Sequence, residues 1–232
     1  SMFGLKYRFR MGTRPESFLG DKDTWVKAES ILKKVLENSG IDYFILEGDG
    51  AFYGPKVDIL MDDSIGREWQ MGTIQLDFHQ PSRFELKYID NEGKEKTPVV
   101  IHRVIYGSLE RFIGILIENF AGAFPAWLSP VQVQVIPISD QNNAYAERLE
   151  TELEKNGVRV KVDKDSERMQ NKIRLAQEQK VPYMLIVGKR EEAEETVSLR
   201  YRDGEEVKDL KFAEFSEKLL NNIKARNLDI KL

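Results

Sequence analysis

A change of periodicity near the middle of the chain constrains its fold more than any other feature. Before residue 124, apolar residues recur first at helical spacing, over residues 25–36, and then in alternation with polar residues. After residue 130, short apolar runs alternate with amphipathic segments of helical period. The segment between them, residues 124–130, is brief and contains two prolines. The sequence therefore predicts two domains, residues 1–126 and 127–232.

The first half is predicted to form a partial antiparallel sheet with two helices, an α+β arrangement. The apolar spacing of residues 25–36 predicts the first helix, and that of residues 109–120 predicts the second. Between them, residues 43–105 alternate with a period of two, and residues 84–88 are predicted to pair with residues 97–101. The helical stripes that we expect to be buried consist of Trp25, Ala28, Ile31, Leu32, Val35 and Leu36, and of Leu109, Phe112, Ile113, Leu116, Ile117 and Phe120.

The second half is predicted to be an α/β domain whose mixed, largely parallel sheet is flanked by helices. Strand and helix signals alternate along it, which is typical of right-handed crossovers between neighbouring strands. The predicted strands are residues 131–136, 158–162, 183–187 and 196–201, and the predicted helices are residues 142–155, 166–179 and 212–225.

Composition narrows the class of protein. The 232 residues are 41% hydrophobic and 32% charged, which is typical of a soluble folded protein and not of a disordered one. The net charge of −4 gives no bulk attraction to nucleic acid, so any RNA binding must use a local patch. The absence of cysteine excludes disulfides and thiolate metal ligands from within the chain.

The terminal and apolar segments bear on location. No stretch approaches the roughly 20 apolar residues of a membrane span, and the first residues lack the layout of a signal peptide. We therefore expect no membrane partner and a cytoplasmic location. The chain does not start with methionine, and aromatic and basic residues alternate over residues 6–11 as in a strand. We expect it to begin inside a domain.

Residues 101–112 resemble the third signature motif of the class II aminoacyl-tRNA synthetases. The matching positions are Gly107, Ser108 and Arg111. In such a motif a strand delivers small residues to the start of a helix, and an arginine in the first turn places a fixed guanidinium beside a bound triphosphate. Taken by themselves, Glu110 and Arg111 are equally well interpreted as solvated helix residues.

Four further segments resemble the threonyl-tRNA synthetase family, in the same order and at similar spacings. They are residues 13–16 (TRPE), 48–56 (GDGAFYGPK), 70–78 (QMGTIQLDF) and 182–184 (PYM). The resemblance covers nearly the whole chain. It implies the C-terminal portion of a class II catalytic domain followed by an anticodon-binding domain.

The resemblance implies one zinc ligand in this chain, His102. In the family, Zn²⁺ held by one cysteine and two histidines binds threonine through its amino and hydroxyl groups. The other ligands should lie upstream of Ser1, because the chain has no cysteine and His79 matches no ligand. A site that ligates a hydroxyl rejects valine far more strongly than an apolar pocket does. Without the resemblance, a lone histidine beside apolar strand residues is more often a satisfied core residue.

Four other residues match substrate positions of the family. Tyr53 and Gln75 match threonine-binding positions, while Gln70 and Lys56 match positions on the nucleotide side. Lys56 and Arg111 are thus the catalytic candidates, and Gln70, Ser108 and Arg111 form the candidate ATP-binding set. The alternative interpretations are a buried tyrosine ring, an exposed lysine and surface glutamines.

The spacing of the two glutamines makes a geometric prediction. Residues five apart face opposite sides of a regular strand, because side chains alternate with a period of two. If Gln70 and Gln75 serve one pocket, the strand must be irregular, and Gly72 is the natural place for a bulge.

In the second half, Glu191 and Arg200 match family positions that read anticodon bases. Glutamate can accept from a base amino group and arginine can donate to a base edge or stack on a ring. The alternative is a solvated acidic loop over residues 191–195 and a strand-surface charge at Arg200. Ser166 stands where many relatives have asparagine. The candidates for phosphate contacts are Lys164, Arg168, Lys172 and Arg174.

The resemblance implies a threonine–tRNA ligase that forms threonyl-adenylate from threonine and ATP with Mg²⁺, then charges tRNA(Thr). The full-length enzyme is expected to be a homodimer, and this chain alone to be inactive, because the first two signature motifs are missing. The alternative is a non-catalytic, synthetase-like module that binds RNA or protein; the intact Arg111, Gln70 and Tyr53 argue against it. A third possibility is a different amino acid, but His102 favours threonine over proline or glycine.

Overall fold

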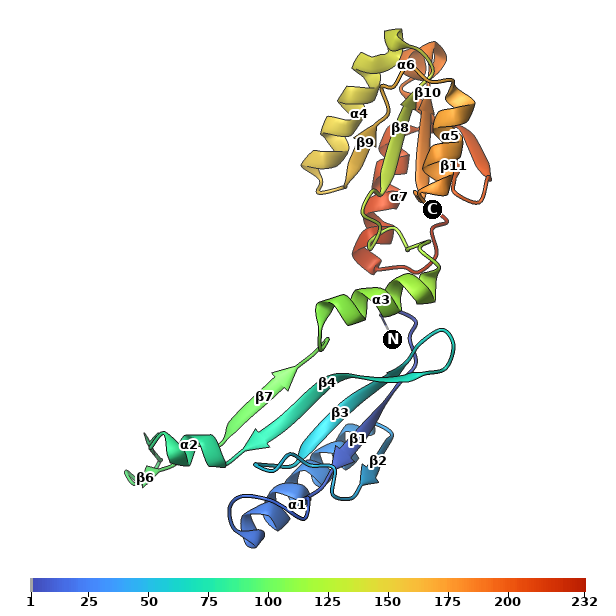
Figure 1. The fold of residues 1–232 in the computed structure, drawn as a ribbon. Coiled ribbons are helices and arrows are strands. Elements are labelled where there is room, and N and C mark those ends of the chain that lie inside the picture. The colour runs from blue at the N-terminus through green and yellow to red at the C-terminus, as the bar shows by residue number, and fades with distance from the viewer. Residues whose placement is uncertain (1) are drawn as a thin grey trace. The chain divides into compact units, whose positions relative to one another are not determined.

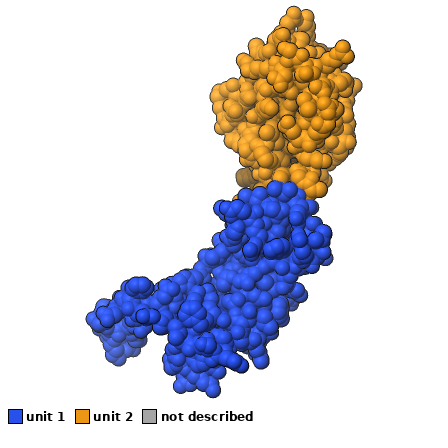
Figure 2. Space-filling model, in the orientation of Figure 1, with its two compact units in different colours: residues 1, 3–119 blue, residues 2, 120–232 orange. Residues whose placement is uncertain are grey.

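The computed structural model describes residues 2–232, which divide into two compact units. One unit covers Phe3–Asn119 and the other Phe120–Leu232, with Met2 grouped with the second (Figure 2). Each unit has its own sheet (Figure 1). A domain boundary between residues 126 and 127 stays a prediction.

The first unit is built on a five-stranded sheet in the order β2-β1-β3-β4-β7. Its strands are β1 (Tyr7–Gly12), β2 (Tyr43–Leu46), β3 (Lys56–Asp62), β4 (Glu68–Asp77) and β7 (Val100–Val104). All neighbours pair antiparallel except β1 and β2, which are parallel. The predicted antiparallel sheet is therefore confirmed, with one parallel pair at its edge.

Helix α1 (Lys22–Ser39) covers one face of this sheet (Figure 1). It begins where the Asp21 carboxylate accepts from the Thr24 amide, and it ends at Gly40, whose φ of 64° only glycine adopts readily. Leu32 and Leu36 of the helix pack against Met11 and Val57 of the sheet. The face that carries Met11 and Val57 is thus the core face, and α1 does not cover the opposite face.

The predicted helical stripes are only partly buried. In α1, Trp25, Ala28, Leu32 and Leu36 are buried, but Ile31 and Val35 are exposed. Helix α3 (Leu109–Phe120) buries Phe112, Ile115 and Leu116 and exposes Leu109, Ile113 and Ile117. The helical period was predicted correctly for both helices. The width of the buried stripe was overestimated, because no described element covers the exposed apolar residues of either helix.

The predicted pairing of residues 84–88 with 97–101 is wrong. Between β4 and β7 the chain forms α2 (His79–Arg83) and a hairpin whose two strands, β5 (Tyr88–Ile89) and β6 (Glu95–Lys96), have two residues each. Val100 and Ile101 pair instead with Asp77 and Leu76 of β4. Strand β4 is ten residues long and offers β7 a partner along its whole length, whereas residues 84–87 form a turn and an irregular segment after α2.

The second unit has a five-stranded sheet in the order β12-β11-β10-β8-β9. The predicted mixed sheet flanked by helices is confirmed, but β12 is a fifth strand that the sequence did not predict. Its elements are β8 (Val133–Pro137), η1 (Asp140–Asn142), α4 (Asn143–Lys155), β9 (Val160–Val162), α5 (Met169–Glu178), β10 (Tyr183–Val187), α6 (Lys189–Glu194), β11 (Thr196–Tyr201), β12 (Glu206–Lys211) and α7 (Phe212–Ala225). The pairs β8–β9 and β8–β10 are parallel, and β11 pairs antiparallel with both neighbours. Within residues 2–232, no helix is long and apolar enough to cross a membrane.

Candidate functional site

Polar residues form rows across the face of the first sheet that α1 does not cover. Lys56 of β3 lies directly opposite Gln75 of β4, which in turn lies opposite His102 of β7. Two residues along β3, Asp58 lies opposite both Arg10 of β1 and Thr73 of β4. Because Val57, between Lys56 and Asp58, points into the core, these rows lie on the opposite face.

A β-bulge brings Gln70 onto the same face. Ile59 pairs with Gly72 and Leu60 with Gln70, so Met71 is an extra residue in β4. The predicted bulge at Gly72 is confirmed. A Cβ at position 72 would lie 2.9 Å from Ile59 Cδ1 and 3.0 Å from the carbonyl oxygen of Ile105, so a larger residue would crowd both neighbouring strands at this bulge. Gln70, Thr73 and Gln75 consequently share one face.

The buried carboxylate of Asp58 connects the nucleotide-side candidates. Its Oδ2 accepts from Arg10 Nη2 at 2.7 Å and from Lys56 Nζ at 2.8 Å. Its Oδ1 accepts from Gln70 Nε2 at 2.7 Å and from Thr73 Oγ1 at 2.8 Å. Sequence reasoning missed Asp58; the alternation Lys-x-Asp in β3 was the available signal.

A second acid completes this cluster. Asp49 Oδ2 lies 3.3 Å from Arg10 Nε and 3.2 Å from Lys56 Nζ. Burial lowers the pKa of the Arg10 guanidinium, but the hydrogen bond to Asp58 and the charges of Asp49 and Asp58 outweigh burial and raise the pKa. The two cations are therefore fixed between two carboxylates.

The threonine-side candidates contact one another. Tyr53 Oη donates to Gln75 Oε1 at 2.8 Å, and the rings of Tyr53 and His102 meet edge to face with centroids 6.1 Å apart. The loop that carries Tyr53 lies against β4, since a Cβ on Gly54 would be only 1.8 Å from the Leu76 carbonyl oxygen. The structure thus brings Tyr53, Gln75 and His102 together.

His102 is held by Asp77. Its Nε2 lies 2.9 Å from Oδ2 of Asp77, whose carboxylate is fully buried and also accepts from the backbone amides of His79 and Gln80. Burial raises the pKa of Asp77, but the hydrogen bonds from His102 and from the two amides outweigh burial, so the pKa lies below its usual range.

The His102 side chain is 40% exposed, which contradicts its interpretation as a buried core histidine. No hydrogen bond to its Nδ1 is formed within residues 2–232. A carboxylate on one ring nitrogen is the arrangement that orients an imidazole toward a metal on the other. No group of three histidine, cysteine or acidic residues that could hold a metal occurs in the described part of the chain.

Ser108 and Arg111 lie apart from these clusters, at the start of α3. Ser108 Oγ accepts from the Arg111 amide at 3.2 Å and donates to Glu110. The Arg111 guanidinium lies 5.3 Å from the ring centroid of Trp69, which pairs with Met61 and so points away from the face of Gln70. The structure does not bring Arg111 into contact with Lys56 or Gln70.

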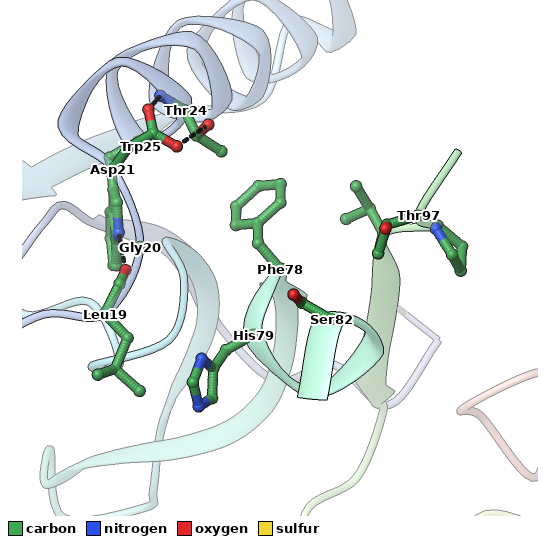
Figure 3. A pocket seen from close by; sticks show the side chains of 11 residues that line it. Leu19, Gly20, Asp21, Thr24, Trp25, Phe78, His79, Ser82 and Thr97 are labelled. Carbon is green, nitrogen blue, oxygen red and sulfur yellow. Dashed lines mark hydrogen bonds between the residues drawn. The ribbon is translucent and has the colours of Figure 1, made fainter. Parts of the chain in front are cut away.

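The first unit also has a cavity of about 350 Å³ between the starts of α1 and α2 (Figure 3). None of the predicted site residues lines it. Two of its polar groups are already used, since Asp21 caps α1 and Trp25 Nε1 donates to the Leu19 carbonyl. We therefore assign it no part in the site.

In the second unit, Glu191 is the best-anchored of the predicted contacts. It lies in α6, where the sequence also allowed a solvated loop. Its carboxylate accepts from the Gly188 amide and from Ser198 Oγ, both at 3.0 Å. Arg200 is two residues beyond Ser198 in β11, on the same face, and its Nη1 donates to Glu206.

One of the predicted phosphate contacts is wrong. Lys172 is buried and donates to the Asp163 carbonyl at 2.9 Å, so it cannot reach a phosphate. Lys164 and Arg174 each pair with a glutamate, and Arg168 is exposed at the start of α5. Periodicity did not reveal that position 172 faces the sheet.

Both units match known protein families. A sequence model described as "tRNA synthetase class II core domain (G, H, P, S and T)" matches residues 16–120, and one described as "Anticodon binding domain" matches residues 132–222. The threonine–tRNA ligase of Thermotoga sp. (strain RQ2) is 50% identical over 230 residues, which are 99% of this chain and 36% of that protein. That of Acetivibrio thermocellus is 49% identical, over 96% of this chain and 35% of that protein. The chain thus spans little more than a third of these relatives.

Two solved structures of aminoacyl-tRNA synthetases are also similar to this chain. The RNA binding domain of threonyl-tRNA synthetase from Cryptosporidium parvum Iowa II has a TM-score of 0.84 at 37% identity, covering 98% of this chain and 56% of that one. Prolyl-tRNA synthetase from Cryptosporidium parvum, solved with halofuginone and AMPPNP, has a TM-score of 0.58 at 26% identity, over 77% of this chain and 38% of that one.

Proposed function

The chain belongs to the threonyl-tRNA synthetase family, and from this premise we propose that the complete protein joins threonine to tRNA(Thr) with consumption of ATP. The observation that carries the proposal is the row formed by Lys56, Gln75 and His102 on one polar face of the sheet. It connects a threonine subsite with a nucleotide subsite. The domains we assign to the two tasks are residues 1–126 and 127–232.

The threonine subsite consists of Tyr53, Gln75 and His102. The hydrogen bond from Tyr53 to Gln75 uses the amide oxygen of Gln75 and leaves its NH₂ group to donate to the substrate. Their mutual contacts fix all three side chains before substrate binds, which lowers the entropic cost of orientation.

The nucleotide subsite consists of Lys56, Gln70, Ser108 and Arg111. Lys56 is held in place by the carboxylates of Asp49 and Asp58 and retains N–H groups for a phosphate. Ser108 and Arg111 lie at the N-terminus of α3, where backbone amides and the helix dipole favour a triphosphate. Arg111 must leave the Trp69 ring to reach it.

These residues support an in-line displacement. A carboxylate oxygen of threonine attacks the α-phosphorus of ATP, and pyrophosphate leaves with the electron pair of the broken P–O bond. A ribose hydroxyl of the tRNA then attacks the carbonyl carbon, loses its proton, and AMP leaves. Lys56 and Arg111 act by neutralising the charge that develops on the phosphates, so no covalent nucleophile of the protein is needed.

His102 fits a zinc ligand. Its Nδ1 is unbonded among the described residues while Asp77 holds Nε2, so the chain supplies one oriented nitrogen donor, and the remaining ligands would come from residues outside it. Bound Zn²⁺ would supply a Lewis acid that recognises the amino and hydroxyl groups of threonine. Mg²⁺ would enter with the phosphates of ATP.

The second unit would recognise the anticodon through Glu191 and Arg200, whose side chains are each anchored by a hydrogen bond. We further propose that the complete enzyme is a cytoplasmic homodimer and that this chain alone is inactive. The alternative, a non-catalytic RNA- or protein-binding module, leaves the cation pair of Arg10 and Lys56 without a use.

Threonine-dependent exchange between pyrophosphate and ATP tests the proposal in the complete protein. We expect exchange with threonine but not with valine, and its loss in His102→Ala. His79→Ala is the matched control, because the imidazole of His79 makes no hydrogen bond within the described residues and lies two positions from Asp77. Equal exchange in wild type and His102→Ala, or exchange that valine supports equally well, would refute it.

A further inference from the structure

The carboxylate of Asp58 is saturated by four donors, and this saturation fixes the direction of every hydrogen bond around it. Each oxygen accepts two bonds: Oδ2 from Arg10 and Lys56, and Oδ1 from Gln70 and Thr73. A carboxylate between two cations only accepts, so each contacting atom must donate. The Gln70 atom 2.7 Å from Oδ1 is therefore its NH₂ group.

Thr73 uses up the remaining hydrogen of that NH₂ group. The single hydroxyl proton of Thr73 is directed to Asp58, so its oxygen can only accept, and it does so from Gln70 Nε2 at 2.9 Å. Both N–H groups of Gln70 are thus occupied. On the other side, Gln70 Oε1 lies 3.2 Å from Arg10 Nη2, which has no lone pair and must donate.

Gln70 is exposed on the polar face, and one lone pair of its amide oxygen is all that it can offer to a ligand. A glutamine without such neighbours could turn its amide and offer either a donor or an acceptor. Phosphate oxygens, which only accept, cannot bind to Gln70 in this orientation. The neighbouring Lys56 and Arg10 are cationic hydrogen-bond donors and can bind phosphate oxygens.

We infer that Asp58 is a positioning residue that, with Thr73, locks Gln70 as a hydrogen-bond acceptor, so that the nucleotide group bound by Gln70 is a donor, either a ribose hydroxyl or the adenine amino group. This inference rests on the proposed function, which places ATP beside Gln70. Gln70 accepts a hydrogen bond from the nucleotide, and Asp58 fixes the Gln70 amide in the orientation that allows it.

The test compares four nucleotides in threonine-dependent pyrophosphate exchange by the complete protein: ATP, 2′-deoxy-ATP, 3′-deoxy-ATP and purine riboside triphosphate, which lacks the amino group. We expect one analogue to show a KM about tenfold above that of ATP, because it leaves the Gln70 oxygen unpaired. Which analogue it is identifies the donor.

Asp58→Asn is the decisive variant. With the oxygen of the introduced amide toward the two cations, its NH₂ group faces the NH₂ group of Gln70, so the Gln70 amide is no longer held in the orientation that offers only an acceptor. In wild type the ratio of the analogue's KM to that of ATP, which we call the penalty, should be about ten. In Asp58→Asn we expect this ratio to fall to about one. Glu68→Gln is the matched control, an acid-to-amide change two residues from Gln70 whose acid pairs with Arg8 outside the network; it should keep the penalty.

Gln70→Met gives a second measurement that does not depend on how well the Asp58 variant folds. It removes the acceptor from an exposed strand position and should also abolish the penalty. If Asp58→Asn or Gln70→Met raises KM for all four nucleotides by the same factor and keeps the penalty, or if the wild type penalises none of the analogues, the inference is overturned. If the wild type shows no threonine-dependent exchange, the proposed function fails, and the inference fails with it.

Discussion

The carboxylate of Asp77 is fully buried, yet it lies 2.9 Å from Nε2 of His102, whose side chain is 40% exposed. The acid thus anchors the ring from within the fold while the ring faces the open side of the sheet. The same carboxylate accepts two amides at the start of α2, so one residue holds both the end of β4 and the orientation of His102.

This anchor predicts a pH dependence of stability. Because the folded-state pKa of Asp77 is below its usual range, its ionised form stabilises the fold above the unfolded pKa of about 4 and stops doing so as the pH falls through the lower, folded value. Asp77→Asn should therefore flatten the acid side of the profile of melting temperature against pH. Thermal denaturation of the complete protein between pH 7 and pH 3 measures it, and parallel profiles for wild type and variant would contradict the prediction.

The polar network predicts a large cost for removing its centre. Asp58→Ala leaves the guanidinium of Arg10 and the ammonium of Lys56 without their buried partner, which should cost roughly 3–5 kcal/mol. Glu68→Ala removes a carboxylate that pairs with Arg8 at the surface, and it should change the stability little. Chemical denaturation of both variants checks this, and equal losses would mean that burial at Asp58 is unimportant.

Two glycines should respond to alanine with opposite signs. A methyl on Gly54 would overlap the Leu76 carbonyl oxygen at 1.8 Å, so Gly54→Ala should lower the melting temperature and displace Tyr53 from Gln75. Gly114 lies inside α3 with no atom near its missing Cβ, and alanine there should stabilise the helix by about 0.5–1 kcal/mol. Differential scanning calorimetry of the two variants separates these outcomes; a tolerated Gly54→Ala would show that this loop can move away from β4.

The sequence predicted those features that one periodicity or one motif encodes. The bulge followed from the five-residue spacing of Gln70 and Gln75, and helices α1 and α3 followed from the apolar spacing of residues 25–36 and 109–120. Strand β12 and helix α6 were missed because their residues are mostly charged and lack an apolar pattern, so their structure depends on pairing with β11 and on the bonds of Glu191.

The polar cluster shows a second limit of sequence reasoning. Arg10, Asp49, Asp58 and Thr73 come from separate segments, and only the register of β1, β3 and β4 brings Arg10, Asp58 and Thr73 into one row. The position of Arg111 over Trp69 likewise depends on how α3 lies beside β4. A motif identifies such residues one at a time, whereas the pairing of strands decides which of them meet.

The anchoring of Glu191 leads to a prediction that separates tRNA recognition from catalysis. Glu191→Gln keeps an oxygen for the Gly188 amide or for Ser198 but removes the charge, so α6 should persist while the acceptor strength toward a base amino group falls. We expect kcat/KM for tRNA in aminoacylation to fall about tenfold, with pyrophosphate exchange unchanged, because the exchange reaction does not require the anticodon. Glu194→Gln, in the same helix but paired with the exposed Arg190, should leave both reactions unchanged. If Glu191→Gln lowers both reactions equally, Glu191 acts through the fold of the protein; if it lowers neither, Glu191 does not contact the tRNA.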